Sequence, residues 1–187
     1  MQDLELIDRL LARGAQARVK VQREFGTLSP EQLTWKPGPD RWSIAECLEH
    51  LRVTKGCYFP VLEQITTGTY RMSTFQRFSP FTRLFGRWMK DQLTEEVKKP
   101  MRTVKAFTPA VSAGGPETRQ QYLDDLDVFL AYLGKCRSVD LDGTVIASPA
   151  TDMITYNLRN CFQFLLEHEH RHIGQGMRVM GMNGFPK

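Results

Sequence analysis

The chain of 187 residues has no long apolar run and no basic, apolar N-terminal segment. Its longest apolar stretches, such as residues 128–133, are far shorter than the roughly 18–20 residues that a helix needs to cross a bilayer. The first residues, Met-Gln-Asp-Leu-Glu, are acidic, whereas a secretory signal begins with basic residues. These absences favour a cytoplasmic protein that has no membrane partner.

The chain also has little excess of charge of either sign, because 25 Lys and Arg residues oppose 21 Asp and Glu residues and leave a net charge of +4. A dedicated nucleic-acid-binding protein usually concentrates basic residues on one face, so we expect no nucleic-acid partner. The chain has only 4 cysteines and no Cys-x-x-Cys pair, which argues against a disulfide framework and a cysteine zinc site. We therefore expect four buried free thiols, at Cys47, Cys57, Cys136 and Cys161.

What the sequence does contain is apolar residues at helical spacing. Hydrophobic residues make up 41% of the chain, which is enough for a packed core. Steps of three and four residues between them predict helices over three ranges: 1–28, 116–133 and 155–180. The capping box of Ser43 and Glu46 predicts the start of another helix, which we expect to continue to about Thr67 with a kink at Pro60. Because no strand pattern persists, the predicted class is all-α.

The least regular part of the chain is residues 68–115, and residues 140–149 are predicted to be a second, shorter loop. Aromatic and basic side chains alternate over residues 71–93, a pattern that also occurs on surfaces that bind single-stranded nucleic acid. A crossover that carries a short amphipathic helix near residues 80–93, with its aromatic side chains packed on the other helices, explains the pattern better. We expect one domain over residues 1–187, with an elaborated crossover over residues 68–115.

Histidine is scarce as well, and three of the 4 histidines lie within five residues. On a helical wheel His168 and His172 share the apolar stripe of the last predicted helix, whereas His170 points to the opposite side. Buried imidazoles need polar partners, which ordinary hydrogen bonds or a metal ion would supply. His50, on a different predicted helix, would complete a set of three ligands from facing helices. Three imidazoles leave open positions on a divalent ion, as catalytic sites do.

Residues 168–172 also match the His-Glu-x-x-His pattern of zinc proteases, in which the Glu is the general base. Residues 173–187 contain no His, Asp, Glu or Cys, so this interpretation lacks a third ligand. Glu169 stays a candidate base or hydrogen-bond partner beside the ligands, with an exposed helical glutamate as the alternative. Gln175 is a candidate contact to a ligand or a substrate, and polar filling of the core is its alternative.

Three blocks of sequence lie in order along the chain. They are Leu-Ser-Pro-Glu-Gln-Leu-Thr-Trp-Lys-Pro (28–37), Asp-Arg-Trp-Ser-Ile-Ala-Glu-Cys-Leu-Glu-His-Leu (40–51) and His-Glu-His-Arg-His-Ile-Gly-Gln (168–175). Together they resemble the DinB/YfiT-like superfamily of metal-binding four-helix bundles over nearly the whole chain. The resemblance implies an antiparallel four-helix bundle with a long crossover between helices 2 and 3. It also implies the metal ligands: His50, His168 and His172.

The same resemblance implies metal-dependent chemistry on a small-molecule substrate. Characterised relatives include transferases and isomerases that use bacillithiol, mycothiol or glutathione, and other members are labelled metal-dependent hydrolases. A divalent ion on three imidazoles lowers the pKa of a bound thiol or water, and zinc, nickel and iron all suit such ligands. We therefore expect a thiol S-transferase with a low-molecular-weight thiol as cofactor. A hydrolase and a non-catalytic metal-binding module of a stress response are the alternatives.

Basic residues near the expected site are candidates for binding the carboxylates of a thiol cofactor. They are Arg52, Arg171 and Arg178, and a solvated surface position is the alternative for each. Cys47 and Cys161 fall near the predicted ligands on the wheel, so a thiolate ligand stays open. Relatives are often dimers, so a homodimer is one of the oligomeric states to expect.

Overall fold

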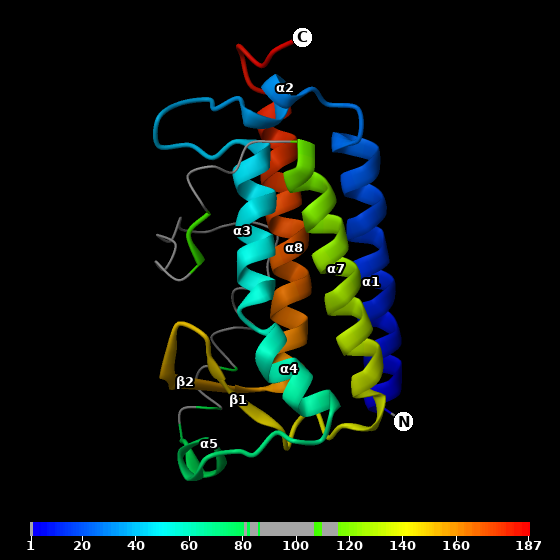
Figure 1. Cartoon of the computed structure of the whole chain (residues 1–187), viewed down its shortest axis with the longest axis vertical. Coiled ribbons are helices and arrows are strands. Elements are labelled where there is room, and N and C mark those ends of the chain that lie inside the picture. Colours follow the sequence, from blue (N-terminus) through cyan, green and yellow to red (C-terminus); the bar gives the residue numbers. More distant parts are fainter. Residues whose placement is uncertain (1, 81, 83–85, 87–106, 110–115) are drawn as a thin grey trace.

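The computed structural model describes residues 2–80, 82, 86, 107–109 and 116–187. Within this part of the chain, four long helices lie side by side along the longest axis of the molecule (Figure 1). They are α1 (Gln2–Phe25), α3 (Ile44–Gly56), α7 (Pro116–Lys135) and α8 (Leu158–Met180). In Figure 1, α1 and α8 run upward, whereas α3 and α7 run downward. α1 and α3 each pack against both α7 and α8. The expected helical class is thus confirmed in its coarser form, since the described chain is mostly helical.

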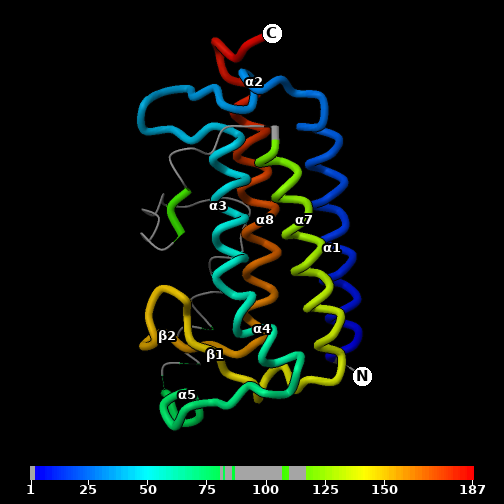
Figure 2. Tube along the Cα trace, in the orientation of Figure 1, coloured from blue at the N-terminus to red at the C-terminus, as the bar shows by residue number. Residues whose placement is uncertain are grey.

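Shorter elements gather at the two ends of these helices, as the tube in Figure 2 shows. At the upper end, α2 (Pro30–Thr34) lies beside the C-terminal segment. The other elements lie at the lower end: α4 (Phe59–Thr66), α5 (Thr74–Phe78), the 3-10 turn η2 (Cys136–Ser138), β1 (Val145–Ser148) and β2 (Thr151–Asn157). In the described part of the chain, no helix has the combination of length and apolar character that crossing a membrane requires.

The single kinked helix predicted through Pro60 is wrong, because the structure has two helices there. α3 ends at Gly56, and α4 begins two residues after Cys57, at Phe59. Pro60 lies in the first turn of α4, where the absence of a backbone N–H leaves no helical hydrogen bond unmade. The proline therefore helps to start the second helix and does not bend the first.

The loop predicted over residues 140–149 and the predicted start of the last helix are also partly wrong. β1 and β2 form an antiparallel hairpin in which Ile146 pairs with Tyr156, and α8 begins only at Leu158. The side chains of Ile146 and Tyr156 are buried. β1 has only four residues, and its register shifts between Ala147 and Ser148. Such a short strand shows no sustained alternation in the sequence.

Side-chain caps determine where the two histidine-bearing helices begin. The Ser43 hydroxyl accepts a hydrogen bond from the backbone N–H of Glu46, and the Glu46 carboxylate accepts one from the N–H of Ser43. This reciprocal pair is the capping box that the sequence predicts at the start of α3. The Asn157 side chain accepts a hydrogen bond from the N–H of Asn160 and caps α8 in the same way.

Close packing brings α8 against its neighbours. The predicted stripe is confirmed for its apolar members, since Cys161, Leu165 and Val179 are at most 3% exposed. A Cβ at Gly176 would lie 2.9 Å from a ring carbon of Phe25, so a side chain at this position would push α8 away from α1. The glycine therefore allows the two helices to approach closely near the end of α8.

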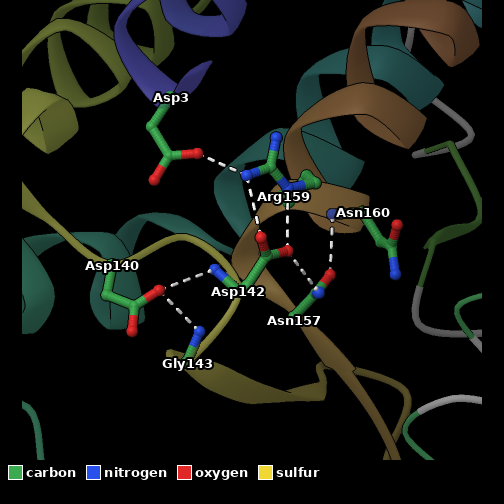
Figure 3. Close-up of polar contacts among 7 residues, drawn as sticks. All are labelled: Asp3, Asp140, Asp142, Gly143, Asn157, Arg159 and Asn160. Carbon is green, nitrogen blue, oxygen red and sulfur yellow. Dashed lines mark hydrogen bonds and ion pairs between the residues drawn. The ribbon is translucent and has the colours of Figure 1, made fainter. Parts of the chain in front are cut away.

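Arg159 joins the loop before the hairpin to the N-terminus of α1 (Figure 3). Its Nε and one terminal nitrogen donate to the two carboxylate oxygens of Asp142, at 2.7 and 2.8 Å, and it also pairs with Asp3. The Asp140 carboxylate accepts hydrogen bonds from the backbone N–H groups of Asp142 and Gly143. These contacts hold the lower end of α8 beside α1.

Most of the predicted crossover lies outside the described residues. This includes nearly all of the amphipathic helix expected near residues 80–93, so its expected packing stays a prediction. Of the aromatic residues in the alternating segment, Phe75 and Phe78 belong to α5 and are 46% and 79% exposed. These two side chains do not contribute to the core.

Candidate metal centre

Three histidines from two helices converge at one place between α3 and α8. His50, His168 and His172 each offer a ring nitrogen, and these three atoms all lie within 4.8 Å of one another. The Nε2 atoms of His50 and His168 are 3.1 Å apart. Two nitrogen ligands at about 2.0–2.1 Å from a tetrahedral zinc ion lie about 3.3 Å apart, so the arrangement fits a divalent ion. Among the described residues, no other group of His, Cys, Asp and Glu has this geometry.

Two of the three rings are held from behind by oxygen acceptors. Nδ1 of His50 donates to the backbone carbonyl of Phe107 at 2.6 Å, and Nδ1 of His172 donates to Oε1 of Gln175 at 2.9 Å. With the proton on Nδ1, each ring keeps the lone pair of Nε2 for a metal ion. Hydrogen bonds of this kind orient the histidines of metal sites and increase their basicity.

The environment also keeps the three rings uncharged. Burial lowers the pKa of His172 to about 3, with a further decrease from the charge of His50. Burial likewise lowers the pKa of His168 far below its ordinary value, and it lowers that of His50 against the opposing effect of the Phe107 carbonyl. Neutral imidazole is the form that binds metal ions, so the site is prepared for an ion near neutral pH.

His170 lies outside the cluster, as the helical wheel predicts. Its Nε2 atom is 3.1 Å from the backbone carbonyl of Arg13 on α1, and its side chain is buried. It therefore contacts the neighbouring helix on the other side of α8. An ordinary hydrogen bond accounts for this histidine without a metal.

Aromatic rings surround the cluster. The Trp42 ring lies 4.9 Å from that of His50 and 5.7 Å from that of His172, and the Phe164 ring stacks on His168 at 5.5 Å, measured between centroids. Trp42 also lines a groove of about 510 Å³. The residues that line it are Thr34, Lys36, Trp42, Ser43, Glu46, Thr108 and Pro109. The tryptophan is thus a wall that the groove and the histidine cluster share.

Glu169 is buried, so the alternative of an exposed helical glutamate is wrong. Its side chain is only 1% exposed, and both carboxylate oxygens have partners. Oε1 accepts a hydrogen bond from Nζ of Lys55 at 2.8 Å, and Oε2 accepts one from the Tyr122 hydroxyl at 2.6 Å. The carboxylate is therefore engaged within the core and is not a member of the histidine cluster.

The three candidate arginines have different surroundings. Arg52 donates to both oxygens of Glu49, at 2.7 and 2.9 Å, and its charge is thereby compensated on α3. Arg171 is half-buried and Arg178 is exposed, and the charges of both disfavour the protonated form of His172. The charges of Arg171 and Arg178 therefore act on His172, whereas Arg52 is paired with Glu49.

All four cysteines are free thiols, and Cys57 is only half-buried, contrary to expectation. Burial raises the pKa of Cys47 to about 12 and that of Cys136 to about 11, and it raises the pKa of Cys161 even further. The pKa of Cys57 is raised for the same reason. None of these thiols is a thiolate near neutral pH, and none belongs to the metal cluster among the described residues.

Sequence reasoning missed several residues that contact the cluster or the neighbouring Glu169. Trp42 directly precedes the capping box of α3, and this adjacency was the one available signal for it. The sequence could not indicate the Phe107 carbonyl as the partner of His50, because every residue has a backbone oxygen. Lys55 and Tyr122, the partners of Glu169, were hidden as members of ordinary helical stretches.

The arrangement defines a helical protein with a candidate metal centre between two of its long helices. A sequence model of the DinB superfamily matches residues 14–175, a range that includes all three clustered histidines. The chain therefore belongs to the DinB superfamily, which confirms the resemblance seen in the three sequence blocks. No curated protein and no solved structure matched the chain.

Proposed function

We propose that this protein is a metal-dependent thiol S-transferase whose divalent ion is held by His50, His168 and His172. The observation that carries the proposal is the convergence of three ring nitrogens within 4.8 Å in an environment that keeps the rings uncharged. We assign the ion to the Nε2 side of His50 and His172, because their Nδ1 atoms are engaged with Phe107 and Gln175.

A bound divalent ion would supply Lewis acidity that lowers the pKa of a thiol or a water beside it. The chain's own thiols are poor nucleophiles, since burial raises the pKa values of Cys47 and Cys161, the two that fall near the ligands on the helical wheel, and also that of Cys57. The nucleophile must therefore come from outside the protein. An external thiol with an organic body agrees with the presence of a groove beside the cluster.

Residues around the cluster would place such a ligand. Trp42 would pack on an apolar part of it and exclude water from one side of the histidines. Lys36 lines the groove, and its ammonium lies 2.9 Å from a Glu46 oxygen. Its side chain is 40% exposed, so the ammonium can reach toward a carboxylate of the ligand. Arg178 offers a second exposed positive charge near His172.

We further propose that the fold is the antiparallel four-helix bundle of DinB/YfiT type, formed by α1, α3, α7 and α8 as one domain. The directions of these helices in Figure 1 support this topology. α5 lies at the lower end of the molecule and α7 starts at the upper end, as a crossover between helices 2 and 3 requires. We also propose a cytoplasmic protein with a small-molecule substrate.

The first test measures bound metal by elemental analysis of purified variants. We expect His50→Ala, His168→Ala and His172→Ala each to lose most of the metal, because two imidazoles bind far more weakly than three. His170→Ala is the matched control on the same helix, since its ring bonds to a carbonyl of α1, and it should keep its metal. Equal loss from all four variants, or no metal in the parent, would contradict the ligand assignment.

The second step of the test addresses the reaction. Metal-loaded protein is incubated with an electrophile and a panel of thiols that includes bacillithiol, mycothiol and glutathione, while free thiol is followed over time. Thiol consumption that is lost in His168→Ala supports the transferase. Hydrolysis of an ester with no use of thiol would instead favour the hydrolase, and inactivity in both assays would favour a non-catalytic metal-binding module.

A further inference from the structure

A buried ion pair with a tyrosine joins three of the long helices near the histidine cluster. Lys55 on α3, Tyr122 on α7 and Glu169 on α8 are each at most 1% exposed. Both oxygens of Glu169 have partners, Nζ of Lys55 at 2.8 Å and the Tyr122 hydroxyl at 2.6 Å. The Lys55 ammonium also lies 4.3 Å from the centre of the Tyr122 ring. We call these three residues the core triad.

Stability alone does not explain the core triad. Removing a lysine and a glutamate from water is costly, and apolar side chains of similar volume often give equal or greater stability at such positions. What an ion pair provides and apolar packing lacks is direction, because each oxygen must meet its donor at a fixed distance and angle. The best-attested use of buried polar groups of this kind is to fix the register between helices.

The positions of the core triad match the place where register matters. Lys55 lies five residues after His50 on α3, and Glu169 lies between His168 and His172 on α8. All three histidines of the cluster come from these same two helices. A slide of α8 along α3 would change the distance between the His50 ring and the rings of His168 and His172. The apolar side chains of the two helices, by contrast, could repack after such a slide with little loss of stability.

We propose that Lys55 and Glu169 are positioning residues that set the register of α8 against α3 and thereby hold the histidine cluster ready for a metal ion. Tyr122 fixes the second oxygen of Glu169 and so prevents the carboxylate from rotating away from Lys55. This inference rests on metal binding in the proposed function, but it concerns helix register, which also exists without the metal.

The test replaces the whole core triad by apolar residues of similar size, in the variant Lys55→Met, Glu169→Leu, Tyr122→Phe. No buried charge or hydroxyl is left unpaired, so we expect urea unfolding to show parent-like or greater stability. The affinity for zinc should fall about 10- to 100-fold, the range typical for loss of residues that orient metal ligands. The visible absorption spectrum of the cobalt-loaded variant should also differ from that of the parent, because the ligand geometry changes.

A matched control comes from the ion pair of Arg13 on α1 and Glu167 on α8, whose nitrogen and oxygen are 3.1 Å apart. Glu167 precedes His168 as closely as Glu169 follows it, but its partner lies on a helix that carries no histidine of the cluster. The variant Arg13→Met, Glu167→Met should keep the parent zinc affinity and cobalt spectrum. A loss equal to that of the triad variant would show that any change beside His168 disturbs the site, and it would overturn the proposal.

Two further measurements test the register role: the zinc affinity of a single variant and the position of α8 in crystal structures. The single variant Tyr122→Phe removes one hydroxyl and should fold, and we expect its zinc affinity to fall severalfold; if the triple variant does not fold, this result decides. Crystal structures of the metal-free parent and triple variant should show α8 displaced along α3 in the variant. An unchanged distance between His50 and His168 would overturn the register role, even if the parent binds no metal and the proposed function itself fails.

Discussion

At the scale of single residues, the role of a histidine in this chain depends on the face of α8 on which it lies. His168 and His172 are one helical turn apart and meet His50, whereas His170 is two residues from each and bonds to the carbonyl of Arg13. A helix turns by about 100° per residue, so a separation of two places a side chain on nearly the opposite face. Three histidines in five residues therefore provide two candidate ligands.

Gln175 provides a prediction at this scale. Its Oε1 accepts the Nδ1 proton of His172 at 2.9 Å and so directs Nε2 of that ring toward the cluster. We expect Gln175→Ala to weaken zinc binding by about 10- to 100-fold, as is typical when a partner that orients a ligand is lost. Gln175→Glu keeps an acceptor of the same length and should retain most of the affinity. Isothermal titration calorimetry measures both; equal affinities for Ala and parent would contradict an orienting role.

At the scale of elements, the start of α3 positions both His50 and residues that line the groove. The capping box of Ser43 and Glu46 directly follows Trp42, and the Trp42 ring lies 4.9 Å from that of His50, measured between centroids. The same Glu46 carboxylate that caps the helix also holds Lys36 at the groove. One local sequence pattern thus fixes the helix start, the aromatic wall and a charge of the groove.

Replacement of the cap gives the second prediction. Ser43 is buried, and its hydroxyl accepts the N–H of Glu46, so Ser43→Ala should lower the free energy of unfolding by about 1 kcal/mol. Ser73 makes the same capping box at the start of α5, which is five residues long and has no buried residue. Ser73→Ala is therefore the control and should change the global stability much less. Urea unfolding measures both values, and an equal loss would argue against the larger role of the α3 cap.

Element boundaries were predictable where a local signal exists. The long amphipathic helices and the cap at Ser43 follow from spacing and from the hydrogen-bonding capacity of serine, both of which are local. The break before Pro60 and the hairpin of β1 and β2 were missed. A proline in the first turn of a helix and a proline inside one look alike in sequence, and a four-residue strand is too short to show a period of two.

At the scale of the whole molecule, a metal ion at the cluster would join α3 to α8 in addition to their apolar packing. An ion that binds the folded state and not the unfolded state adds RT ln(1 + [metal]/Kd), which is about 2.7 kcal/mol at a metal concentration 100 times Kd. For a chain of this length, such a gain corresponds to an increase in Tm of about 5–10 °C.

Chelation therefore provides the third prediction. We expect Tm of the metal-loaded protein to fall by this amount when a chelator removes the ion, and to recover when zinc is added in excess. Differential scanning calorimetry measures the shift. His168→Ala should show no such dependence on metal, since it lacks a ligand, while His170→Ala should respond as the parent does. A parent Tm that is the same with and without metal would contradict a site between two helices.

The sequence by itself determined the helical class, the cap that starts α3, and the pair of histidines on one face of α8, because each depends on residues within a few positions of one another. The tertiary structure alone decided that the Phe107 carbonyl holds the ring of His50, and that Glu169 lies in the core with Lys55 and Tyr122. These contacts join residues that are 47 to 114 positions apart in the sequence, and only the folding of the chain brings them within hydrogen-bond distance.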